Sequence, residues 1–146
     1  MSDRTFLGTG GVERRQGRLC RLDLSAAAHP VTTAREWARS VLSRWQIGSP
    51  LDEDVVLVVS ELVANAMMHA GAVRELHLLW LDRRTVRIEV TDTSRTAPSP
   101  MQPRRGRPGG HGLVIVRTLC RSWGTVPRAA GKTVWAELVG SWQPGA

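Results

Sequence analysis

The sequence lacks any apolar run long enough to cross a membrane, and its start, MSDRTFLGTGG, lacks the basic-then-apolar layout of a secretory signal. We therefore expect a cytoplasmic protein with no membrane segment. Cysteine is also scarce. Cys20 and Cys120 match no metal-binding spacing and are too few for a disulfide framework, so both are expected to be reduced thiols.

Lysine is almost missing as well, because Lys132 is the only lysine among twenty basic residues in a chain of net charge +7. Arginine suits bidentate contacts, so this balance allows nucleic acid, an acidic protein or a nucleotide phosphate as ligand. The arginines are scattered, however, and no helix-turn-helix, zinc-finger or RNA-binding signature is present. We therefore expect no direct contact with nucleic acid. A GC-rich genome would also produce such a composition.

The length of 146 residues and the 42% hydrophobic content fit one domain with a single core. We expect a flexible arm at 1–17, a domain at 18–139 and a tail at 140–146. Within the domain, residues 93–110 hold four prolines, four arginines and three glycines. Such a stretch is neither helix nor central strand, and at that length it is usually functional. We predict a lid there; the alternative is a disordered surface loop.

Hydrophobic periodicity predicts the regular elements. Helical spacing indicates helices over 31–45, about 50–69 and 110–123, each followed by a glycine that would end it. Ser49 is expected to cap the second helix. Alternation of apolar and polar residues predicts strands at 18–24, 73–81, 86–92, 123–126 and 132–139.

Polar residues stand at the borders of these elements. Glu61 and Asn65 follow an apolar run and lie one turn apart on one face of the second helix. Asp92 shares a strand face with the apolar residues at 86, 88 and 90, which places a carboxylate at the buried side of a strand end. The glycine-rich turn at 110–113 opens the third helix, where unpaired N–H groups favour an anion. Each feature alone is common, but their order is not.

In that order the features resemble the GHKL ATP-binding superfamily, which includes gyrase, Hsp90, MutL and histidine kinases. Within it, the chain looks like the stand-alone anti-sigma factor serine/threonine kinases of bacteria, over roughly Leu22 to Leu138. The resemblance implies an α+β fold of the Bergerat type, a two-layer α/β sandwich in which helices cover one face of a mixed, mostly antiparallel sheet. The matching segments are ELVANAMMHA for the N box, VTDTS for the first glycine box in reduced form, GGHGL for the second, and GKTVWAEL for the closing glycine-threonine segment.

The resemblance also implies a site for ATP and Mg²⁺. Glu61 would be the catalytic general base, and Asn65 would hold Mg²⁺ through its amide oxygen. Asp92 would accept a hydrogen bond from the adenine amino group, and Thr133 would bond near the adenine beside it. The phosphates would be held under the lid at the helix start by Gly110, Gly112 and Leu113.

The first glycine box departs from the family pattern. The usual form is Asp-x-Gly-x-Gly, but here Ser94 and Thr96 replace both glycines. Glycine allows close backbone approach and positive φ, so its loss implies weaker ATP binding or a reshaped pocket.

Two functions follow from these features. The first is a regulatory serine/threonine kinase that phosphorylates an anti-sigma-antagonist protein and, in another state, sequesters a sigma factor; relatives of this kind are often dimers. The second is a non-catalytic interaction module with weak or no nucleotide binding, which the missing glycines favour. The catalytic half of a histidine kinase is less favoured, since no dimerising helix pair with a phosphoacceptor histidine is apparent.

Overall fold

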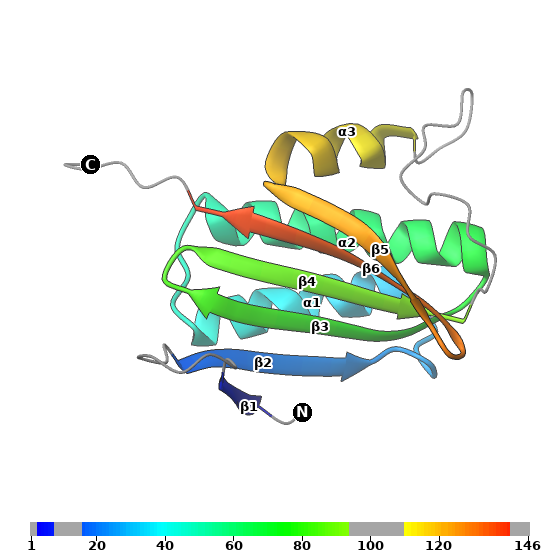
Figure 1. The fold of residues 1–146 in the computed structure, drawn as a ribbon, viewed down its shortest axis with the longest axis horizontal. Coiled ribbons are helices and arrows are strands. Elements are labelled where there is room, and N and C mark those ends of the chain that lie inside the picture. Colours follow the sequence, from blue (N-terminus) through cyan, green and yellow to red (C-terminus); the bar gives the residue numbers. More distant parts are fainter. Residues whose placement is uncertain (1–2, 8–15, 94–109, 141–146) are drawn as a thin grey trace.

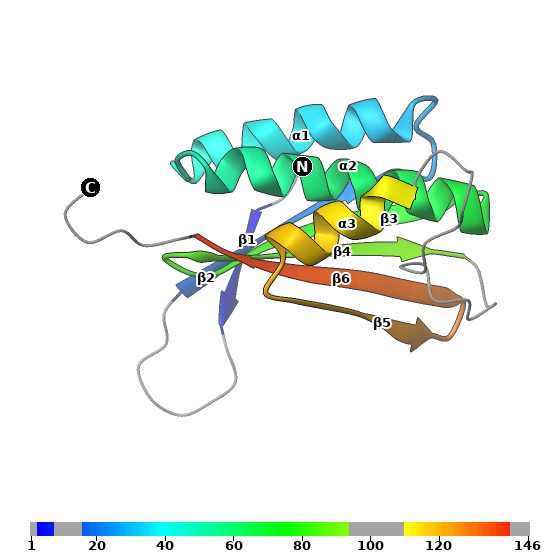
Figure 2. The ribbon, with the colours of Figure 1, turned by 90° about the horizontal axis from the view of Figure 1, so that it is seen from above.

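The computed structural model describes residues 3–7, 16–93 and 110–140, which form a two-layer α+β sandwich (Figure 1). Three helices lie on one face of a single six-stranded sheet, as Figure 2 shows from above. This confirms the predicted fold class. The sheet order is β1-β2-β3-β4-β6-β5, and every described pairing is antiparallel, where a mixed sheet was expected. The elements are β1 (Asp3–Leu7), β2 (Gln16–Asp23), α1 (Pro30–Arg44), α2 (Leu51–Ala70), β3 (Val73–Asp82), β4 (Thr85–Asp92), α3 (Gly110–Leu119), β5 (Ser122–Arg128) and β6 (Gly131–Val139).

Helix α1 packs on the sheet because its apolar residues recur at helical spacing. Its end differs from the prediction, since Gln46 rather than Gly48 adopts the left-handed conformation, with φ 58°. The Ile47 N–H then donates to the Leu42 carbonyl at 3.0 Å, the return contact that closes a Schellman motif. The side chains of Leu42 and Ile47 pack in and against the core, and this packing compensates for a non-glycine residue in the left-handed conformation. The buried residues of α1 are Ala34, Trp37, Ala38, Val41 and Leu42.

Helix α2 is the central helix of the covering layer. Its end at Gly71, with φ 72°, confirms the predicted stop. Its start differs from the prediction that Ser49 caps the helix. Pro50 occupies the cap position, and no side chain makes a capping hydrogen bond there. The Glu53 N–H instead bonds to the Asp52 carboxylate at 2.7 Å. The buried residues of α2 are Val55, Val56, Val58, Val59, Leu62, Val63 and Ala66.

The third helix is shorter than predicted and ends at Leu119, not at residue 123. Directly after it, the Arg121 N–H donates to the Glu137 carbonyl at 2.8 Å, which starts the pairing of β5 with β6. Trp123 pairs across from Ala136 and packs against the core as a strand residue. The residues at the start of β5, whose apolar pattern also fits a helix, therefore form a strand because they pair with β6.

The N-terminal arm also differs from the prediction, because residues 3–7 form β1 and pair with β2 at the edge of the sheet. The predicted lid, apart from its end residues, lies outside the described residues, and so does the tail from 141 onward. None of the described helices has the length and apolar character that spanning a membrane requires.

Candidate functional site

The first part of the site lies on the second half of α2. Glu61 and Asn65 are both half-buried, one turn apart on the helix. Their neighbours Leu62 and Ala66 are buried in the core, whereas Met68 on the outer side is half exposed. The carboxylate and the carboxamide therefore stand at the border between core and solvent, where side chains can reach a ligand while the backbone stays fixed.

The second part is Asp92, the last residue of β4. Its side chain is 1% exposed, and it shares the helix-covered face of the sheet with Ile88 and Val90, as the alternation predicts. Asp92 pairs with Lys132 of β6 in the sheet register. The Lys132 Nζ lies 2.9 Å from Asp92 Oδ2, so the two form a buried ion pair.

The sequence reasoning missed Lys132 as a site residue. Its side chain is only 5% exposed, which is unusual for an ammonium group. The signal was present, since Lys132 has the same strand parity as Val134, Ala136 and Leu138, which face the core. Within the described part of the chain, Nζ makes the ion pair but no hydrogen bond with proper geometry.

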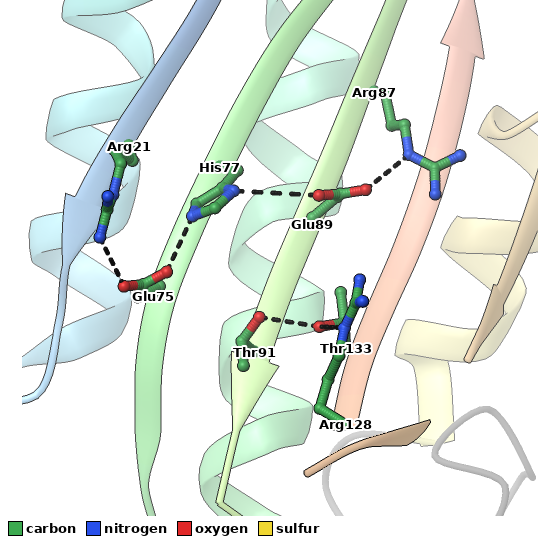
Figure 3. A network of polar contacts seen from close by, with 8 residues as sticks. All are labelled: Arg21, Glu75, His77, Arg87, Glu89, Thr91, Arg128 and Thr133. Carbon is green, nitrogen blue, oxygen red and sulfur yellow. Dashed lines mark hydrogen bonds and ion pairs between the residues drawn. The ribbon is translucent and has the colours of Figure 1, made fainter. Parts of the chain in front are cut away.

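The position of Thr133 corrects the expectation that it binds beside Asp92. Successive strand residues point to opposite faces, so Thr133 faces away from the side of Lys132 and Asp92. Its hydroxyl is 2.9 Å from that of Thr91 and accepts from Arg128 Nε at 3.1 Å. Figure 3 shows these three residues with others on the face of the sheet away from the helices. Thr133 therefore does not share a ligand with Asp92 in this arrangement.

Gly131 fixes how closely the start of β6 approaches the end of β4. Its φ is +154°, a conformation that favours glycine, and a Cβ added there would collide with the Asp92 carbonyl oxygen. The backbone of the closing segment is thus pressed against the strand end that carries Asp92. This close approach holds Lys132 in place beside the carboxylate.

The third part of the site is the start of α3, formed by the predicted phosphate-binding residues Gly110, Gly112 and Leu113. The first turn of a helix leaves backbone N–H groups unpaired and carries a partial positive charge. The helix begins at the predicted residue, and its backbone can therefore receive an anion.

The direction of α3 brings this positive end towards Asn65. Cys120, just past the end of α3, is close enough to Asp54 in the first turn of α2 to feel its charge; burial and that charge raise the pKa of the Cys120 thiol to about 12. The two helices are antiparallel neighbours (Figure 2). The first turn of α3 therefore lies towards the second half of α2, which carries Glu61 and Asn65.

All parts of the site lie on elements that end or begin at one end of the sandwich. In Figures 1 and 2, the end of α2, the end of β4, the start of β6 and the start of α3 lie at the same side of the molecule. Only the Thr133 side chain is turned away. The arrangement offers a carboxylate and an ammonium group at the sheet, a carboxamide and a carboxylate on α2, and the N-terminus of α3 at the same end of the molecule.

This arrangement suits a nucleotide with a magnesium ion. Mg²⁺ keeps several waters and usually takes one or two protein ligands in addition to phosphate oxygens, so a single carboxamide such as Asn65 is a reasonable donor. The described residues contain no group of three or more His, Cys, Asp or Glu that could hold a metal without a ligand's help. The buried ammonium of Lys132 makes one ion contact, with Asp92, and no hydrogen bond of proper geometry within the described residues, so it can donate to a ligand that brings a further acceptor.

Comparison with known families supports this interpretation. Residues 24–138 match the family model of the histidine kinase-like ATPase domain, which covers most of the chain and includes every residue of the site. No curated protein sequence matches the chain.

Proposed function

Because the chain belongs to the histidine kinase-like ATPase domain family, we propose that it uses ATP and Mg²⁺ to phosphorylate a serine or threonine of a partner protein. The observation that supports the proposal is that Glu61 and Asn65 lie one turn apart on the second half of α2, at the side of the molecule where α3 begins. In the proposal these residues supply a base and a metal ligand, and the start of α3 supplies an anion site.

Each residue has a distinct role in this proposal. Asp92 accepts a hydrogen bond from the adenine amino group, and the N–H groups at Gly110 and Gly112 bind phosphate. Asn65 would hold Mg²⁺, which would neutralise charge on the phosphates. Glu61 would accept the proton of the substrate hydroxyl as this oxygen attacks the γ-phosphorus, while the bond from the γ-phosphorus to the β,γ-bridging oxygen breaks and ADP leaves.

The partner proteins are proposed from the sequence resemblance to anti-sigma factor kinases. The phosphorylated protein would be a small anti-sigma-antagonist protein, and a sigma factor would be sequestered in another state of the same chain. The protein would act in the bacterial cytoplasm, with no membrane or nucleic-acid contact of its own, and as a homodimer if it behaves as such relatives often do.

The alternative function is a non-catalytic interaction module. One structural observation favours it, because the Asp92 carboxylate already has a buried cation, Lys132, at 2.9 Å. The absence of both glycines from the first glycine box, at Ser94 and Thr96, points the same way. A fold of this kind could present a surface to a partner with nucleotide as a weak ligand or none.

The substitution Glu61→Ala separates the two functions. We expect it to reduce phosphate transfer from labelled ATP to the antagonist protein by about 10²- to 10⁴-fold, because the base is lost, and to leave ATP binding nearly unchanged. Transfer is measured with candidate antagonists encoded by the same genome, and binding by calorimetry.

Glu53→Gln is the matched control, because it removes a carboxylate from the other end of the same helix. It should transfer phosphate like the unchanged protein. Equal transfer by Glu61→Ala and the unchanged protein would remove the base assignment. Absence of transfer by the unchanged protein to any candidate, with ATP bound, would favour the module.

A further inference from the structure

We propose that Lys132 recognises the purine together with Asp92, by donating a hydrogen bond from Nζ to the N1 ring nitrogen of adenine. This inference rests on the proposed function, since it assumes that the site binds ATP. It assigns base recognition to a residue pair, in which Asp92 accepts from the 6-amino group and Lys132 donates to the neighbouring nitrogen.

The register of the sheet places the two groups side by side. Asp92 and Lys132 are direct partners across β4 and β6, on the face that the helices cover. Both are more than nine-tenths buried, and the Nζ–Oδ2 distance is 2.9 Å. Gly131 presses the start of β6 against the Asp92 backbone, which fixes the position of the Lys132 backbone. The donor and the acceptor are therefore held next to each other by the strands themselves.

The chemistry of the pair matches the edge of adenine. A carboxylate only accepts hydrogen bonds, and an ammonium group only donates them. Adenine presents an amino donor at C6 and an acceptor at N1, adjacent to it. A ligand edge with one donor beside one acceptor is thus complementary to Asp92 beside Lys132.

The unfilled hydrogen-bonding capacity of Lys132 is the observation that points to a ligand. An ammonium group has three N–H donors, yet within the described residues Nζ has one ion contact and no hydrogen bond of proper geometry. A buried donor without an acceptor destabilises the fold, so such a group calls for an explanation. A ring nitrogen of the nucleotide would supply the acceptor.

The choice of residue type agrees with this role. Every other basic residue of the chain is arginine, and Lys132 alone is lysine. An ammonium is compact and can donate to a single nitrogen, whereas the planar guanidinium is larger and suits bidentate acceptors such as a carboxylate. At this buried position opposite Asp92, an arginine would direct its paired N–H groups to the carboxylate. A lysine keeps a donor that can bind the ligand.

Adenine analogues test the contact directly by calorimetric titration. In 1-deaza-ADP a C–H replaces N1, and in 7-deaza-ADP the change lies on the other side of the base. We expect the unchanged protein to bind 1-deaza-ADP about 10- to 100-fold more weakly than ADP, as for one hydrogen bond to a charged group. It should bind 7-deaza-ADP and ADP alike.

Lys132→Met should bring the ratio of ADP to 1-deaza-ADP affinity close to one, because the donor is gone. Thr91→Val, beside Asp92 but on the other sheet face, is the matched control and should keep the ratio of the unchanged protein. If Lys132 only balances the charge of Asp92, Lys132→Met weakens both ligands equally and the ratio persists, which would overturn the proposal. If Lys132→Met does not fold, the ratio of ADP to 1-deaza-ADP affinity is measured on the double variant Asp92→Asn with Lys132→Met. This variant leaves no unpaired buried charge.

A spectroscopic readout is available because the chain has one lysine. Protein labelled with ¹⁵N-lysine has a single side-chain ammonium signal, which should shift on saturation with ADP and shift less with 1-deaza-ADP. A signal that does not move with bound ADP would contradict the contact. Failure of ADP and ATP to bind at all removes the proposed function and this inference together, whereas binding of ADP and 1-deaza-ADP with equal affinity removes this inference alone.

Discussion

At the residue scale, the site depends on a buried ion pair and on the glycine that positions it. Removing one partner of a buried pair is strongly destabilising, by about 3–5 kcal/mol, because the other charge stays buried without compensation. Replacing both is far better tolerated. The pair between Asp92 and Lys132 is therefore better explained by a role at the site than by a large contribution to stability.

Gly131→Ala tests the close approach of β6 to Asp92. Its added Cβ would collide with the Asp92 carbonyl oxygen, and φ of +154° is unfavourable for alanine. We expect a loss of about 1–3 kcal/mol in the free energy of unfolding in urea, together with weaker ATP binding.

Gly48→Ala is the control for this change. A Cβ at Gly48 would meet no atom within 4 Å, so its unfolding free energy should stay within about 0.5 kcal/mol of the unchanged protein. Equal stabilities of the two variants would show that β6 does not need this close approach.

The residue scale is also where the sequence is least sufficient. The burial of Asp92 follows from counting alternate residues along β4, and the structure confirms it. The same alternation along β6 places Lys132 with Asp92 and Thr133 on the other face, whereas the family resemblance implies Thr133 as the binding residue. A motif identifies which segment closes the site, whereas the strand parity decides which of its side chains faces the ligand.

At the element scale, the two halves of α2 have different roles. Its valine-rich first half is anchored in the core, and its second half carries Glu61 and Asn65 at the border of the core. The packing of the first half fixes the backbone that carries these two side chains. The exact ends of the helices were less predictable: Gln46 ends α1 without glycine, and β5 begins where a longer α3 was expected, since tertiary contacts outweigh local preference there.

The open face of the sheet is held by charge pairs across strands, which Figure 3 shows. Glu75 of β3 accepts from Arg21 of β2 at 2.8 Å and is 2.9 Å from His77 Nε2. Partial burial opposes ionisation of Glu75, but the contacts with His77 and Arg21 outweigh it, so its pKa is lowered. The contribution of this group to stability is complete above the ordinary pKa of 4.5 and is lost as pH falls through the lowered value.

Glu75→Gln should therefore destabilise the protein at pH 7 and have progressively less effect below the ordinary pKa. Because Glu75 is partly exposed, the loss at pH 7 should be no more than about 1 kcal/mol. Urea unfolding at pH 7 and near pH 3 measures the difference.

Glu36→Gln is the control, since Glu36 is exposed on α1 and forms no ion pair with the described residues. It should be nearly neutral at both pH values. An effect of Glu75→Gln that grows on acidification would contradict the assignment, because a group with a lowered pKa loses its contribution in acid.

At the scale of the whole molecule, the sheet and the helices deliver four chain segments to one end of the sandwich (Figures 1 and 2). The order of strands and helices from residue 18 onward was predictable, because each has a clear apolar period. β1 was not, since residues 3–7 lack such a period and gain their structure by pairing with β2. The arrangement of the end of α2, the end of β4 and the start of α3 at one side of the molecule could be expected only from the family resemblance, because periodicity alone does not fix how elements pack.

A titration of the unchanged protein with ATP in the presence of Mg²⁺ tests the central claim most directly. We predict saturable binding of one nucleotide per chain with a dissociation constant below about 1 mM, weaker without Mg²⁺ and weaker after Asn65→Ala, because the metal loses its carboxamide ligand. An absence of binding at several millimolar ATP, or binding that neither Mg²⁺ nor Asn65→Ala alters, would contradict the account.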